Sequence, residues 1–153
     1  MPVRTAIVFA VAITIAAGAP ALNATLVSAA GSLDYEFYKA KVQPIFLTKR
    51  PGHAPCVMCH AEANNMLRLE KLPDGQAAWN EEQTRKNFDT VSKIVQAVDD
   101  PLKAKILVHP LAPEAGGDAF HSGGRQFADK SDPNWKIIAQ WAQGATLAPA
   151  KGK

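Results

Sequence analysis

The chain contains few cysteines, which cross-link small proteins, and lacks the alternating sequence pattern that is typical of strands. Cysteine occurs only twice in 153 residues, at Cys56 and Cys59. A network of disulfides and a zinc site built from two cysteine pairs are therefore both excluded. Alternating runs of β-branched residues, which predict strands, are also missing. These absences favour a mainly α fold.

Long hydrophobic runs are equally scarce, and the clearest one lies at the N-terminus. Arg4 precedes the apolar run 6–17, and small residues follow it. This order is typical of a signal peptide, with cleavage near residue 21 or 30. The run is short for a membrane span, which needs about 20 apolar residues. We therefore expect a signal peptide at 1–30 that directs export to the periplasm, with an uncleaved N-terminal membrane tether as the alternative.

The rest of the chain has the size and charge of one soluble domain. We expect a single domain over residues 31–146 and a disordered tail over 147–153. The whole chain has 17 basic and 14 acidic residues and a net charge of +3. Such a balance lacks the strong basic excess of nucleic-acid-binding domains, so we expect no nucleic-acid partner.

Both cysteines lie in the segment Cys56-Val57-Met58-Cys59-His60, which has the pattern C-x-x-C-H. The pattern is typical of covalent haem c attachment, in which two thiols bond to the haem and the histidine binds its iron. The spacing places both sulfurs and the imidazole on about one helical turn. A redox-active dithiol is the alternative, but the chain lacks the βαβ pattern that surrounds such pairs. We therefore predict one covalent haem, bound through Cys56 and Cys59, with His60 as the proximal iron ligand.

The second axial ligand of the iron decides between electron transfer and ligand binding. Met58 lies between the cysteines, and His53 and Met66 lie close to the motif, so we expect other roles for them; for Met66 this role is core packing. His109 follows a predicted helix, whereas His121 lies among glycines that let the backbone approach a flat cofactor. These glycines are Gly116, Gly117, Gly123 and Gly124. His121 is the favoured distal ligand and His109 the alternative.

Three segments resemble the planctomycete-type cytochrome c domain family. They are Phe37-Tyr38-Lys39 to Phe46 followed by C-x-x-C-H, His121-Ser122-Gly123-Gly124-Arg125-Gln126-Phe127, and Pro133 to Gly144 with its two tryptophans. The resemblance covers roughly residues 35–144 and implies a small cytochrome c-like helical fold wrapped around one haem. It also makes His121 the candidate distal ligand. Arg125 follows the glycines and is a candidate contact for a haem propionate, since arginine suits carboxylates.

Helix signals divide the domain into short helices joined by long loops. Capping residues, prolines at first helical positions and apolar stripes locate each helix. We expect helices from Asp34 to an end or bend at Pro44, over 56–63, over 81–98 with Asn80 as N-cap, from Pro101 to before Pro110, and from Pro133 to Gly144 with Asp132 as N-cap.

These predictions point to a non-enzymatic carrier of single electrons between redox proteins, whose donor and acceptor the sequence does not identify. Two alternatives stay open. A vacant distal face would make the protein a haem-based gas sensor or peroxidase, and the domain also suits the cytochrome subunit of a larger dehydrogenase complex. The cations Lys41, Lys49 and Arg50 form a possible docking patch for an acidic redox partner, against the alternative of a solvated face.

Overall fold

The computed structural model describes residues 32–147. This part of the chain is mainly helical and has no strand, which confirms the mainly α prediction. The expected signal peptide (1–30) and residues 148–153 of the expected tail lie outside the described range. The helices in chain order are α1 (Tyr35–Phe37), η1 (Tyr38–Val42), α2 (Gln43–Leu47), α3 (Cys56–His60), α4 (Glu81–Gln96), η2 (Pro101–Lys103), α5 (Lys105–Val108), η3 (Pro113–Ala115) and α6 (Pro133–Ala142). No helix between residues 32 and 147 is long and apolar enough to span a membrane.

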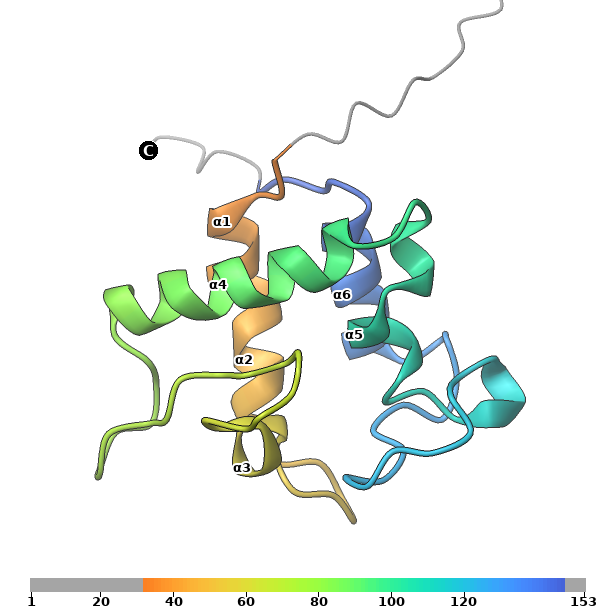
Figure 1. Ribbon diagram of the computed structural model, residues 1–153, viewed down its shortest axis with the longest axis horizontal. Coiled ribbons are helices and arrows are strands. Elements are labelled where there is room, and N and C mark those ends of the chain that lie inside the picture. The colour runs from red at the N-terminus through yellow and green to blue at the C-terminus, as the bar shows by residue number, and fades with distance from the viewer. Residues whose placement is uncertain (1–31, 148–153) are drawn as a thin grey trace, which may run out of the picture.

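The first three helices form one continuous column (Figure 1). Asp34 caps its start, and Oδ1 of Asp34 accepts a hydrogen bond from the Phe37 amide at 2.5 Å. Of the two expected outcomes at Pro44, an end or a bend, the end is wrong, because the column continues to Leu47. Proline disrupts a regular helix because it lacks an N–H and collides with the preceding turn. The π-helical turn η1 ends at Val42, two residues before Pro44, so the column departs from regular α-helical geometry just ahead of the proline.

Helix α4 crosses this column near the end where the described chain begins (Figure 1). Its predicted N-cap is confirmed: Asn80 accepts from the Gln83 amide at 2.9 Å, and the Gln83 side chain accepts from the Asn80 amide. This reciprocal capping box satisfies two backbone donors that a helix start otherwise leaves free. The helix ends at Gln96, two residues before the predicted limit, and Val98 is exposed.

Helix α6 contacts both the start of the column and α5. Trp141 and Tyr38 are fully buried against one another, with ring centroids 5.3 Å apart. The Trp141 indole donates to the Asp34 carbonyl at 2.8 Å, and the Trp135 indole donates to the Leu107 carbonyl at 3.2 Å. The start of the column and the end of α6 therefore lie together, at the opposite end of the molecule from α3 (Figure 1).

The chain between α5 and α6 is fixed at its base by a backbone bridge. Leu111 and Phe127 form an isolated parallel bridge, in which the Ala112 amide donates to the Phe127 carbonyl at 2.9 Å. Gly117 packs directly on this bridge, where a Cβ atom would lie 1.9 Å from the Leu111 carbonyl oxygen. Any side chain at this position would collide with the backbone. We call the segment closed by this bridge, residues 116–126, the His121 loop.

Asp132 provides the N-cap of α6 and also pairs with Arg50. Its carboxylate accepts from the Asn134 and Trp135 amides and forms an ion pair with Arg50. Burial alone would raise the pKa of Asp132. The Arg50 guanidinium and the two amides more than offset this effect, so the pKa lies below its usual value.

We expect D132A to lower the free energy of unfolding by about 1 to 2 kcal/mol, because it removes both a cap and an ion pair. D132N should cost less, because asparagine keeps the cap. The lowered pKa means that the ionic contribution is present above the unfolded-state value of about 4 and disappears as the pH falls through the native pKa. Denaturant titrations should therefore show that the difference in free energy of unfolding between wild type and D132N becomes smaller in acid. A difference that stays constant to pH 2 would contradict this account.

Candidate haem site

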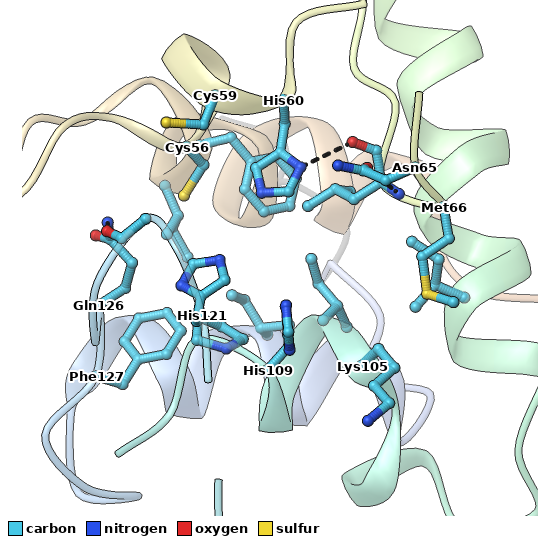
Figure 2. Close-up of a pocket in the computed structure, with 18 of the residues that line it drawn as sticks. Cys56, Cys59, His60, Asn65, Met66, Lys105, His109, His121, Gln126 and Phe127 are labelled. Atoms are coloured by element: carbon cyan, nitrogen blue, oxygen red, sulfur yellow. Dashed lines mark hydrogen bonds between the residues drawn. The ribbon is translucent and has the colours of Figure 1, made fainter. Parts of the chain in front are cut away.

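A cavity of about 280 Å³ opens between α3 on one side and α5 with the His121 loop on the other. Its deep wall is apolar and is built by the core helices. The apolar side chains are Ile45, Phe46, Ile94, Ile106, Phe127 and Ile138. Figure 2 shows that Cys56 and Cys59 lie at one end of the cavity, and Met66 and Lys105 lie at the other. The cavity therefore combines a hydrophobic interior with reactive and basic groups at opposite ends.

Helix α3 carries three of the predicted site residues but has only five residues itself. An isolated helix of this length is unstable in water. The structure holds it by a parallel bridge between Ala61 and Leu69, in which the Leu69 amide donates to the His60 carbonyl at 2.9 Å. The predicted end near residue 63 is therefore wrong, because the chain leaves the helix at Ala61 to form this bridge.

The rings of His60 and His121 face each other across the cavity (Figure 2). Their centroids are 6.3 Å apart and their planes differ by 14°. The two residues are 61 positions apart in the sequence, so the core, and no local turn, sets this separation. The two imidazoles are therefore nearly parallel and are separated by more than a direct ring contact.

Both imidazoles are held by backbone carbonyls through the same nitrogen. Nδ1 of His60 lies 3.0 Å from the Leu67 carbonyl oxygen, and Nδ1 of His121 lies 2.5 Å from the Gly124 carbonyl oxygen. A carbonyl only accepts hydrogen bonds, so each Nδ1 must donate its proton. Each Nε2 is then left with a free lone pair, which is the arrangement that a metal ligand requires.

Charge and packing also favour the neutral form of His121. Burial lowers the pKa of His121, and the nearby His109 and His60 lower it further, against the opposing effect of the Gly124 carbonyl. The His121 ring also packs on Gly123, where a Cβ atom would lie 3.1 Å from Cε1. The close approach seen here is to the His121 ring, and the predicted approach of these glycines to a flat cofactor stays a prediction.

His109, the predicted alternative, lines the same cavity. Its ring centroid is 4.7 Å from that of His121, and the two planes differ by 73°. Its Nδ1 lies 2.7 Å from a carboxylate oxygen of Asp118, which Lys105 also contacts at 2.8 Å. Lys105 and His109 together lower the pKa of Asp118. A charged carboxylate therefore orients His109, whereas backbone carbonyls orient His60 and His121.

The two thiols differ in their surroundings. Cys56 is half-buried against the cavity and Cys59 is exposed. Burial raises the pKa of the Cys56 thiol, although Arg50 partly offsets this effect. The thiol of Cys56 is therefore protonated at neutral pH. Both sulfurs lie at the same end of the cavity, as the motif predicts for two bonds to one cofactor edge.

Three other residues were singled out in the sequence, and the structure contradicts the expected place of one of them. Met66 is 65% exposed and lines the cavity mouth, so the expected core role is wrong. The His53 ring lies beside Gly124, next to the His121 loop. Arg125 is not among the cavity-lining residues; its guanidinium donates to the Ala119 carbonyl at 2.5 Å and to the His109 carbonyl at 3.5 Å. Its propionate contact stays a prediction.

Two lining residues had no signal in the sequence. Gln126 is buried, and its amide donates to the Ala54 carbonyl at 3.2 Å, which joins the His121 loop to the approach to α3. Asp118 supports His109 from nine positions further along the chain. Neither residue was given a role from the sequence: Gln126 lies in the segment 121–127 that carries the resemblance, but only the folded chain shows that it and Asp118 line the cavity.

The part of the chain that the structure describes contains no group of three or more His, Cys, Asp or Glu side chains able to hold a metal ion by themselves. Haem requires fewer protein ligands, because the porphyrin supplies four nitrogens to the iron. Comparisons of the chain with protein-family models, curated proteins and solved structures found no match.

Arg125 ties two backbone carbonyls together, and this contact leads to a testable expectation. We expect R125Q to speed amide hydrogen exchange in residues 118–124, because the carbonyls of His109 and Ala119 then lose the guanidinium that donates to both. R125K should behave similarly, since lysine lacks the fork of donors that spans two acceptors. Hydrogen-exchange mass spectrometry is the measurement, and K136Q, an exposed cation on α6, is the control. Unchanged exchange in R125Q would show that Arg125 does not hold the loop.

Proposed function

We propose that the chain is an exported c-type cytochrome with one covalent haem, which carries single electrons between redox proteins. The paired geometry of His60 and His121 is the observation that carries this proposal. The C-x-x-C-H segment, the apolar cavity and the resemblance of residues 37–46, 121–127 and 133–144 to planctomycete-type cytochrome c domains support it. The signal-peptide pattern at residues 1–30 supports export, because covalent haem attachment in bacteria takes place outside the cytoplasm.

The separation of the two imidazoles matches what one shared iron requires. A metal–imidazole bond is about 2 Å long, and a ring with bonds of about 1.33 Å has its centre roughly 1.1 Å from each atom. Two imidazoles on opposite sides of one metal therefore have centroids about 6.3 Å apart. The rings of His60 and His121 are separated by 6.3 Å. This agreement supports the proposal that both imidazoles bind one iron.

Different residues of the cavity would contact different parts of the haem. Cys56 and Cys59 would hold the haem covalently, each thiol S–H adding across one vinyl group to give a thioether. Nε2 of His60 and Nε2 of His121 would bind the iron, and the Leu67 and Gly124 carbonyls orient the two imidazoles through their Nδ1 atoms. The apolar wall would exclude water from the cofactor. The helices would then enclose the haem as a cytochrome c-like fold does.

Filled axial positions favour electron transfer over ligand chemistry. Bound haem supplies one-electron chemistry at its iron. Two imidazoles held before the cofactor arrives need little rearrangement when the iron changes its charge. Ligation by two histidines should also give a lower reduction potential than ligation by histidine and methionine, since methionine raises it. We therefore expect a low to intermediate potential. Membership of a larger dehydrogenase complex is compatible with this activity.

Visible spectroscopy of protein produced with the haem-attachment machinery tests the proposal directly. We expect covalent haem by mass spectrometry, a six-coordinate low-spin spectrum in the reduced state, and no change on adding carbon monoxide. C56A/C59A should lose covalent attachment, because both thioether bonds are removed. A rapid shift of the wild-type spectrum with carbon monoxide would overturn the carrier proposal.

The distal ligand can be identified from the angle between the ring planes. The planes of His60 and His121 differ by 14°. The His109 plane differs from that of His121 by 73°. Because the His60 and His121 planes are nearly parallel, the His109 plane is also steeply inclined to that of His60. Electron paramagnetic resonance of the low-spin ferric protein responds to this angle. We expect the rhombic signal of nearly parallel imidazoles, whereas ligation by His109 would give the highly anisotropic signal of nearly perpendicular ones.

Substitution gives an independent test of the same assignment. H121A should open the distal site, so that the reduced protein binds carbon monoxide. H109A is the matched control, because it removes a second histidine from the same cavity and should leave the spectrum low-spin. If H109A opens the site and H121A does not, His109 is the ligand.

A second function has one specific observation in its favour. The His109–Asp118 pair, at 2.7 Å, resembles the carboxylate-supported histidines that transfer protons in enzymes. With a vacant distal site, His109 could act on a bound peroxide or gas. Carbon monoxide binding by the wild-type protein would support this open-face sensor or peroxidase.

A further inference from the structure

A second hollow adjoins the haem cavity at the end away from the cysteines. It lies between the 66–68 segment, the C-terminal half of α4 and the start of α5. Met66, Ile94 and Lys105 line both spaces, so the two lie side by side. Arg68 and Lys93 complete the rim of the hollow. Three cations from three different segments therefore converge at one end of the cavity.

Two of these three cations are not neutralised by the protein. Within residues 32–147, Arg68 and Lys93 take part in no ion pair. Lys105 contacts both carboxylate oxygens of Asp118, at 2.8 and 3.0 Å. A lysine ammonium has three N–H donors, so Lys105 can contact a further acceptor while it keeps Asp118. The three cations that line the hollow can therefore donate further hydrogen bonds to anionic oxygen atoms.

The chemistry of haem places two anions at this location. The vinyl groups and the two propionates occupy opposite edges of the porphyrin. Thioether bonds to Cys56 and Cys59 would hold the vinyl edge at one end of the cavity, and the propionates would then be directed to the end where Met66 and Lys105 lie (Figure 2). We propose that Arg68, Lys93 and Lys105 form the binding site for the two haem propionates. This inference rests on the proposed function and assigns the part of the cofactor that the sequence motif leaves open.

Electrostatics favours this arrangement over the contact expected for Arg125. A carboxylate without a partner in an apolar cavity is costly, whereas charge-assisted hydrogen bonds to arginine or lysine offset that cost. Arg125 already donates to two backbone carbonyls and does not line either space. Arg68 can offer two parallel N–H donors to one carboxylate, and Lys93 offers a point charge from α4.

The test compares haem-loaded variants of the full chain. R68Q/K93Q removes two proposed contacts at exposed positions, where substitutions rarely affect folding. K103Q is the matched control, because Lys103 is an exposed cation two residues before Lys105 and lines neither space. R125Q tests the competing assignment. Resonance Raman spectroscopy reads the propionate bending bands, which respond to hydrogen bonding, and a redox titration gives the reduction potential.

We expect all four proteins, including wild type, to attach haem covalently with a low-spin spectrum. R68Q/K93Q should shift the propionate bands and lower the reduction potential, because fewer positive charges then oppose the oxidised iron. K103Q and R125Q should leave the bands in place. Attached haem with unshifted bands in R68Q/K93Q, or shifted bands in R125Q alone, would overturn this inference and leave the proposed function intact. A wild-type chain that attaches no haem would overturn both.

Discussion

The position of His60 depends on a chain of hydrogen bonds that leads away from its own helix. The backbone of α3 is joined to Leu69, and the next amide, that of Glu70, donates to the side chain of Asn87 at 2.7 Å. Asn87 is fully buried on α4. A five-residue helix with little stability of its own is thus fixed to the longest helix of the structure through one asparagine. The orientation of the C-x-x-C-H segment is therefore a property of the core.

The opposite wall is fixed by different contacts. The Leu111–Phe127 bridge closes the base of the His121 loop, and Gln126 ties the loop back to Ala54. The imidazole separation therefore reflects two walls that are anchored by different contacts and are joined both by the buried helices and by the hydrogen bond from Gln126 to Ala54. Contacts of this kind order both imidazoles during folding, so less ordering cost remains to be met on binding.

Sequence patterns correctly predicted features that depend on neighbouring residues, such as helix caps, but did not predict features formed by segments that are distant in the chain. The caps at Asp34, Asn80 and Asp132 were correct because a capping side chain and its target amides are neighbours in the chain. Whether the column ends or bends at Pro44 was left open, because a π-helical turn leaves no compositional mark. The cationic hollow was missed for a related reason: its members come from three segments, whereas Arg125 was chosen only for its place beside the glycines. The preference for His121 over His109 came from the glycines around His121 and stays a prediction, whereas the angles between the three imidazole planes could not be read from the sequence.

The two ends of the described chain lie together at the pole opposite α3 (Figure 1). Coupling to an electrode or to a fusion partner through residue 147 would therefore leave the cysteine-bearing face directed outward. The contact between Trp141 and the carbonyl of Asp34 also brings the two ends close enough for a short linker to join them. A circularly permuted chain with new termini in the exposed 73–78 segment would keep every helix whole, and would move the attachment point to the other side of α4.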